Sequence, residues 1–242
     1  MKGYFTFPLL LFFFTQVIAE DAKQYYNAGK FDEALFALSK LENEGNKGSE
    51  LYFNKAMCHY KLSEYPSAIL YFEKALKWDP NCESCLQMLS VSQKKTGLEL
   101  YALPENKVIG IYFSVLNQWP TLIWFMAALL LISFTLYLNY YWQRADRYLK
   151  FPYFINALLV VAVISLLMAA HREYLFLKSD QFILMMPVAL KKSPDEKSPD
   201  IQQLLAGMKL KKTLQLGTWI KVETTEFDSG WVPADKLAAI SL

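Results

Sequence analysis

The composition of this 242-residue chain indicates a membrane protein with modest soluble parts. Hydrophobic residues make up 54% and aromatic residues 16% of the chain, and its mean hydropathy is positive. With 25 basic and 23 acidic residues, the net charge of +2 gives no strong field for nucleic acid. Three cysteines are too few for a disulfide-stapled scaffold, and two histidines without clustered partners argue against a metal site. We therefore expect no metal, no cofactor and no nucleic-acid partner.

Residues 1–19 have the features of a cleaved signal peptide. Lys2 precedes an apolar run from Tyr4 to Phe14, and Ala19 precedes two acidic residues. This run is shorter than the roughly 20 residues that a bilayer core requires. We expect cleavage after Ala19 and export of the following segment, with an uncleaved N-terminal anchor as the alternative.

Residues 119–142 and 152–171 are long, charge-poor segments, each predicted to form a transmembrane helix. Only residues 143–151 separate them, so the two helices form a tight hairpin. The alternative is a pair of buried core helices in a soluble protein. Residues 98–118 are expected to be a linker followed by an interfacial segment that leads into the first span.

The loop at 143–151 sets the expected topology. It holds Arg144, Arg147 and Lys150 against one acidic residue, Asp146. By the positive-inside rule the loop lies in the cytoplasm, and both flanking soluble parts lie outside. The predicted location is thus a bacterial inner membrane, crossed twice, with both soluble parts periplasmic.

Residues 20–97 carry a sequence repeat with a period of 34. Gly29, Ser63 and Gly97 recur at this spacing, as do several aromatic and alanine residues. Residues 49–82 closely resemble a tetratricopeptide repeat, with 15–48 as a weaker unit and 83–97 as a half unit. Because about two and a half units are fewer than a free-standing stack needs, we expect a neighbour to complete the α-helical solenoid. Self-association through the repeats is one possibility.

The resemblance implies a concave peptide-binding face lined by the first helix of each unit. Such a face would be aromatic with a basic edge and would suit a peptide with some acidic residues. The alternative is that its apolar members only pack on a neighbouring helix. The residues carried over are Lys23, Tyr26, Asn27, Phe53, Met57, Tyr60, Lys61, Gln87 and Lys94.

After a linker at 172–181, residues 182–242 change to an alternating pattern typical of short strands in a small all-β barrel. Asp228, Ser229 and Gly230 are expected to form a turn before the next strand. The order of these pieces resembles a bacterial SH3-like domain. Trp219 and Trp231 are its candidate surface residues, with the alternative that the Trp219 ring only packs structurally.

Cys82 and Cys85 form a C-x-x-C pair at the predicted start of a helix. A helix N-terminus stabilises a thiolate, so a thiol-redox role is chemically possible. No thioredoxin-like βαβ pattern accompanies the pair, and a passive disulfide or two free thiols is the alternative. We expect no catalytic residue in this chain.

The order of signal peptide, tetratricopeptide units, membrane hairpin and SH3-like barrel resembles the E-type members of the Bat (aerotolerance) group. This resemblance implies a non-enzymatic scaffold that joins other Bat proteins, some with von Willebrand factor A domains, and has a role in stress or oxygen tolerance. The other hypotheses are a thiol-redox protein using Cys82 and Cys85, and peptidoglycan attachment through the SH3-like domain.

Overall fold

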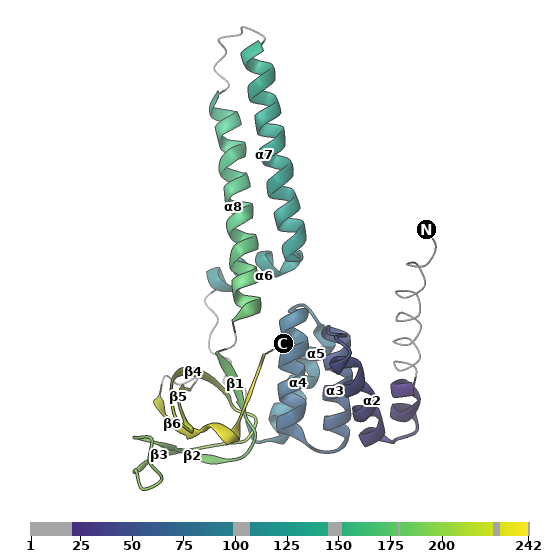
Figure 1. Ribbon diagram of the computed structural model, residues 1–242, viewed down its shortest axis with the longest axis vertical. Helices are drawn as coiled ribbons and strands as arrows, with labels where there is room; N and C mark the ends of the chain where they lie inside the picture. Colours follow the sequence, from purple (N-terminus) through teal and green to yellow (C-terminus); the bar gives the residue numbers. More distant parts are fainter. Residues whose placement is uncertain (1–20, 99–106, 145–151, 179, 225–227, 242) are drawn as a thin grey trace, which may run out of the picture. The chain divides into compact units, whose positions relative to one another are not determined.

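The computed structural model describes residues 21–98, 107–144, 152–178, 180–224 and 228–241. The chain divides into two compact units (Figure 1). One comprises Met1–Tyr101 with Ser179–Leu242, and the other is Ala102–Lys178. The predicted signal peptide at 1–19 and most of the predicted loop at 143–151 lie outside the described residues.

The repeat domain, defined here as residues 21–98, is entirely helical (Figure 1). Its helices are a first helical segment at 21–27, α2 (Phe31–Asn43), α3 (Ser49–Lys61), α4 (Tyr65–Trp78) and α5 (Glu83–Lys95). Ala56 of α3 and Ala68 of α4 are both fully buried. Their small side chains let these two helices approach each other closely. Phe72 and Ala75 are fully buried as well, in two neighbouring apolar clusters, and a further cluster lies between the first helical segment, α2 and α3.

The period of 34 has a direct structural cause at the ends of the first helices. Gly29, Ser63 and Gly97 all have positive φ, at 76°, 63° and 75°. This left-handed conformation stops a helix and lets the chain reverse, and glycine adopts it at the lowest cost. The recurring position therefore marks the same turn three times, with glycine at two of the three sites.

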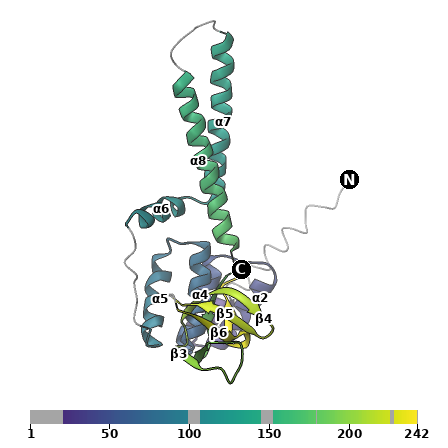
Figure 2. The same ribbon diagram turned by 90° about the vertical axis from the view of Figure 1, so that its left-hand side faces the viewer.

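The β domain, defined here as residues 180–241, is one antiparallel sheet that curves round its own apolar core (Figures 1 and 2). The strand order is β3-β2-β6-β5-β4-β1-β7. The predicted C-terminal all-β region is thus present as an antiparallel sheet. Its elements are β1 (Gln181–Leu184), β2 (Val188–Lys191), β3 (Asp200–Leu204), β4 (Lys209–Leu216), β5 (Trp219–Glu223), β6 (Ser229–Pro233), the 3-10 helix η1 (Ala234–Lys236) and β7 (Leu237–Ala239).

Gly230 lies within a strand, and the prediction that it forms a turn with Ser229 is wrong. Strand β6 begins at Ser229, and Gly230 pairs with Val222 of β5. A Cβ atom at Gly230 would lie 2.5 Å from Cγ of the buried Leu190 and 2.8 Å from the Lys191 carbonyl oxygen. The glycine is therefore required for close approach of β6 to β2.

The β domain packs directly on α4 of the repeat domain, within the same compact unit. Ile183 of β1 and Ile240, just after β7, are buried in one apolar cluster with Ile69 of α4. Two polar contacts flank this cluster: Lys209 Nζ lies 2.8 Å from Glu73 Oε2, and Lys77 Nζ donates to the Ile240 carbonyl at 3.3 Å. A neighbour within the same chain therefore covers part of the short repeat stack.

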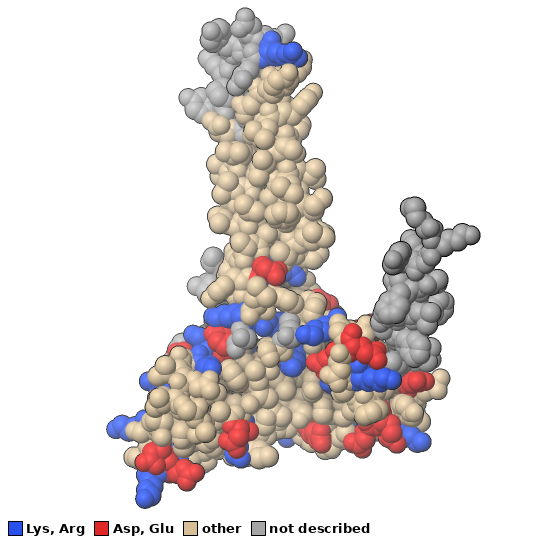
Figure 3. Space-filling view, in the orientation of Figure 1, with Lys and Arg blue, Asp and Glu red and all other residues tan. Residues whose placement is uncertain are grey.

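The second unit consists of α6 (Lys107–Gln118), α7 (Thr121–Arg144) and α8 (Pro152–Leu177). Two stretches, Thr121–Tyr141 and Asn156–Leu177, are long and apolar enough to cross a membrane, as judged by length and composition. On the face shown in Figure 3, the α7–α8 hairpin carries charged side chains only near its ends. Helix α8 continues to Leu177, so residues 172–177 of the expected linker at 172–181 are helical.

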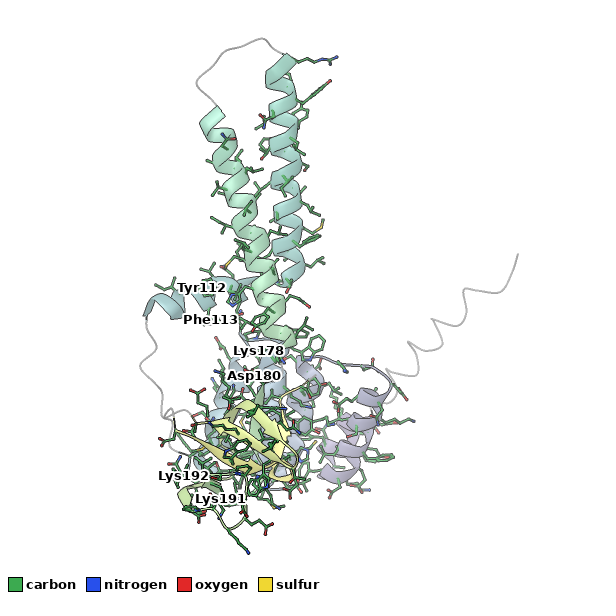
Figure 4. All side chains as sticks on the ribbon, turned by 60° about the vertical axis from the view of Figure 1, so that its left-hand side comes forward. Tyr112, Phe113, Lys178, Asp180, Lys191 and Lys192 are labelled. Carbon is green, nitrogen blue, oxygen red and sulfur yellow. A yellow bond between two sulfur atoms is a disulfide. The ribbon has the colours of Figure 1, made fainter. Side chains whose placement is uncertain are left out.

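Small and polar side chains hold α6, α7 and α8 together. Ala128 of α7 and Ala162 of α8 are buried, and Ser165 Oγ donates to the Trp124 carbonyl at 2.8 Å. Such contacts are typical of helix pairs in membranes, where small residues allow close packing. Tyr112 of α6, labelled in Figure 4, forms a hydrogen bond with His171 of α8.

Candidate functional site

The predicted peptide-binding face divides into exposed polar residues and half-buried apolar ones. The exposed members are Lys23, Asn27, Lys61, Gln87 and Lys94. They come from the first helical segment, the end of α3 and helix α5. Three of the five are lysines, so the accessible part of the face is mainly cationic.

The apolar members of the same face are largely engaged in packing within the repeat domain. Phe53, Met57 and Tyr60 are half-buried and contact the central apolar cluster. The Phe53 ring lies 5.8 Å from Phe72, and Tyr60 makes an edge contact with Tyr65 at 5.7 Å. These side chains keep a partly accessible edge, but part of their apolar surface is already covered.

Tyr26 follows the same pattern in the first unit. It is half-buried against a second apolar cluster and meets Phe31 edge-on, with ring centroids 5.4 Å apart. Burial raises the pKa of its hydroxyl, and the nearby Cys58 adds to the shift. Cys58 is itself buried in this cluster, where burial raises the pKa of its thiol to about 11. A thiol with this pKa is inert at neutral pH.

The structure also contains a buried ion pair that the sequence analysis missed. Lys55 of α3 lies 2.5 Å from Glu42 of α2, and their side chains are only 4% and 23% exposed. The repeat offers a sequence signal for this pair. Leu89 lies 34 residues after Lys55, at the equivalent position of the next unit, and is a buried apolar residue. A lysine at the equivalent position requires a carboxylate partner, because a buried unpaired ammonium is very costly.

Aromatic rings surround this ion pair. The Lys55 ammonium lies 4.7 Å from the Tyr71 ring centroid, and His59 stacks on the same ring at 5.1 Å. Lys74 lies over both Tyr71, at 5.5 Å, and Tyr52, at 5.6 Å. Cation–π contacts of this kind stabilise desolvated cations. The cluster joins α2, α3 and α4, so its role in the structure is to fix the helices in place.

Charge in this cluster shifts the pKa values of its members. Burial opposes ionisation of Glu42, but the hydrogen bond and charge of Lys55 outweigh it and lower the pKa of Glu42. Burial and the charge of Glu42 raise the pKa of Tyr52. Burial lowers the pKa of Lys74, with Glu42 opposing that shift and Lys55 adding to it.

Trp219 and Trp231 lie on the same outer face of the β domain, on neighbouring strands. Trp219 pairs with Pro233, and Lys221 pairs with Trp231. Because directly paired residues project from the same side of an antiparallel sheet, all four share one face. Both tryptophans are half-buried, whereas Ile220 and Val222 alternate with them and fill the core.

Cys82 and Cys85 form a disulfide at the start of α5. Cys82 is the N-cap residue, and its sulfur accepts a hydrogen bond from the backbone N–H of Cys85 at 3.2 Å. Cys85 is fully buried beside Tyr52 and Ala75, while Cys82 is partly accessible. Among the described residues no cluster of three or more potential metal ligands is present.

Comparison with known proteins identifies one region of the chain. Residues 49–82, which form α3 and α4, match the tetratricopeptide repeat family. Repeats of this family are typically non-enzymatic modules that mediate protein–protein interaction. No curated protein matches the chain. The repeat match and the two long apolar helices together fit a membrane protein that carries tetratricopeptide repeats.

Proposed function

We propose that this chain is a non-enzymatic, membrane-anchored scaffold that presents its repeat domain and β domain to other proteins. The observation that carries the proposal is the tetratricopeptide match at 49–82 in a chain with two membrane-length helices. The exposed lysines of the predicted face, Lys23, Lys61 and Lys94, support an acidic peptide segment as its ligand.

The proposed location is a bacterial inner membrane, with both domains on the periplasmic side. The basic loop between the two apolar helices supports this orientation, as does the signal-like segment at 1–19. The domain order supports membership of a Bat-type complex with a role in stress or oxygen tolerance. Partners with von Willebrand factor A domains are then expected.

Site-specific photo-crosslinking tests the repeat-domain surface. A crosslinkable residue at Lys61 or Gln87 in the full-length protein is expected to give a discrete adduct in intact cells. A matched position, Lys40, is exposed on α2 outside the predicted face and is expected to give none. With the crosslinkable residue at Gln87, changing Lys61 and Lys94 together to Glu should lower the adduct yield by roughly tenfold, because it reverses the charge that attracts an acidic segment.

The proposal fails if Lys61, Gln87 and Lys40 give the same adducts, or if the double charge reversal leaves the yield unchanged. Mass spectrometry of the adduct identifies the partner and tests the Bat-type assignment separately. Peptidoglycan attachment through the β domain predicts a different result: the protein would stay bound to isolated cell-wall sacculi.

The Cys82–Cys85 disulfide favours a second candidate function, thiol–disulfide exchange. In such a reaction a partner's thiolate would attack the Cys82 sulfur of the disulfide, forming a mixed disulfide on Cys82 and releasing Cys85 as a thiol. A second thiolate of the partner would then displace Cys82, which leaves Cys82 and Cys85 reduced and the partner with a new disulfide. The partial accessibility of Cys82 and the burial of Cys85 fit this order of attack.

For the scaffold function, changing both cysteines to Ser should cost little. The loop that the disulfide closes is short, so its removal is expected to cost about 1 to 2 kcal/mol or less. Crosslinking from Lys61 should then persist. Non-reducing gels of a Cys85→Ser variant decide between the candidates: mixed disulfides on Cys82 that are absent from the double mutant would establish exchange chemistry.

A further inference from the structure

The β4–β5 hairpin ends in an exposed, apolar tip. Every residue from Thr213 to Thr218 is exposed. Among them Leu214 and Leu216 are 55% and 58% exposed, although leucine is usually buried. The tip therefore presents hydrocarbon to its surroundings at the end of two paired strands.

These leucines continue the outer face that carries the two tryptophans. Leu216 pairs with Trp219, and Leu214 pairs with Lys221. On the next strand Trp219 pairs with Pro233, and Lys221 pairs with Trp231. We call this surface the Leu–Trp patch; it consists of Leu214, Leu216, Trp219, Lys221, Trp231 and Pro233.

The charge of the hairpin is of one sign only. Residues 209–222 contain four lysines and no acidic residue. Lys209 pairs with Glu73, and Lys211 lies 3.4 Å from Glu223. Lys212 and Lys221 form no ion pair with a carboxylate among the described residues. Lys221 lies opposite Leu214 and shares the face of the exposed leucines, whereas Lys212 lies opposite Val222 on the other side of the sheet and donates to Gln215. Lys221 is thus the cation on this face that is available to an anionic surface.

At the other end of the patch, Lys191 of β2 lies beside Trp231 in the sheet (Figure 4 labels Lys191). This lysine lies 2.6 Å from Asp200 and is already neutralised. The uncompensated positive charge is therefore concentrated at the hairpin and not spread over the whole face.

We propose that the Leu–Trp patch is a membrane-docking surface that inserts the tip of the β4–β5 hairpin among anionic lipid headgroups. Leucine and tryptophan side chains beside lysines are the combination that binds at the interface of an anionic bilayer. The leucines protrude from a tip and do not line a groove, which favours a lipid surface over a peptide as the occupant.

The chain connection supports the same occupant, and this step rests on the proposed membrane anchoring. Helix α8, a candidate span, ends at Leu177, and β1 begins at Gln181. The four Cα–Cα steps from Leu177 to Gln181 span no more than about 14 Å when fully extended. In a chain whose α8 crosses the bilayer, the β domain thus starts close to the lipid headgroups.

Depth-dependent quenching in proteoliposomes tests this inference on the full-length protein. A fluorophore is attached at Gln215→Cys and quenched by lipids that carry a nitroxide at the headgroup. Cys58 is buried and Cys82 is paired with Cys85, so labelling without reductant reaches only the new cysteine. Gln203→Cys, exposed on β3, is the matched control.

We expect the label at 215 to be quenched roughly fivefold more strongly in vesicles with 30% phosphatidylglycerol than in phosphatidylcholine vesicles, because each lysine near an anionic surface favours docking by about that factor. The label at 203 should not respond to lipid charge. Changing Leu214 and Leu216 together to Gln should abolish the response at 215, whereas Ile201→Gln, which removes an exposed apolar side chain elsewhere in the β domain, should not.

Resistance of the protein to alkaline extraction separates this inference from the proposed anchoring. If the protein resists extraction but the label at 215 is as water-exposed as the label at 203, the docking surface is overturned and a protein partner becomes the expected occupant. If the protein is extracted, both the anchoring and the inference built on it fail.

Discussion

Replacing Gly207 with valine is expected to loosen the β domain from the repeat domain while each remains folded. Gly207 has a φ of +87°, and a Cβ atom there would lie 2.6 Å from Cδ1 of the buried Ile69 on α4. A β-branched residue in this conformation costs about 1 to 2 kcal/mol, and overpacking against Ile69 adds a similar amount. The sum, about 3 kcal/mol, would raise hydrogen exchange in β1 and β7 by roughly 100-fold.

Gly217→Val is the matched control for this change. Gly217 also has a positive φ, at 56°, but no atom lies within 4 Å of the position that its Cβ would take. It therefore carries the backbone strain without the clash, and exchange in β1 and β7 should remain slow. Equal acceleration by both variants, measured by mass spectrometry on the full-length protein in detergent, would show that contact with Ile69 does not hold the two domains together.

The helical part of the fold was predictable because its determinants are local. Gly29, Ser63 and Gly97 occur at one spacing and adopt one conformation, so the sequence repeat translates directly into a repeat of turns. Ala56 and Ala68 are buried where two helices approach, as their size predicts. Periodicity identifies such positions without any knowledge of distant contacts.

The parts that were not predictable depend on residues far apart in the chain. Gly207 lies between β3 and β4 and approaches Ile69 of α4 so closely that no Cβ atom would fit. The two residues are far apart in the chain, and no sequence periodicity relates their positions. Gly230 was assigned to a turn because glycine favours turns, whereas its actual constraint is the Leu190 side chain on another strand. Phe53 and Met57 of the predicted face pack against an apolar cluster that includes residues of α4, α5 and the β domain, and this cluster could not be inferred from α3 alone.

Replacing Glu42 with glutamine is expected to destabilise the repeat domain by leaving the Lys55 ammonium buried without a carboxylate. Removing one partner of a buried ion pair is costly, because the remaining charge keeps its desolvation penalty. We expect the free energy of unfolding to fall by about 2 to 3 kcal/mol. For the compact unit that comprises the repeat domain and the β domain, this lowers the melting temperature by roughly 5 to 10 °C. Thermal unfolding of the full-length protein in detergent, followed by circular dichroism at neutral pH, measures the change.

A second variant and a pH series show whether the pair itself is responsible. Lys55→Met in combination with Glu42→Gln removes both charges and places an apolar side chain where the next unit has Leu89, so most of the lost stability should return. The depressed pKa of Glu42 gives the sign of the pH dependence. Ionised Glu42 contributes fully to the free energy of unfolding above the ordinary carboxyl pKa of about 4.5. This contribution is lost as the pH falls through the lower pKa that Glu42 has in the folded protein. The destabilisation caused by Glu42→Gln should therefore shrink below that pH, and a difference that stays constant from pH 7 to pH 3 would show that the ion pair does not stabilise this domain.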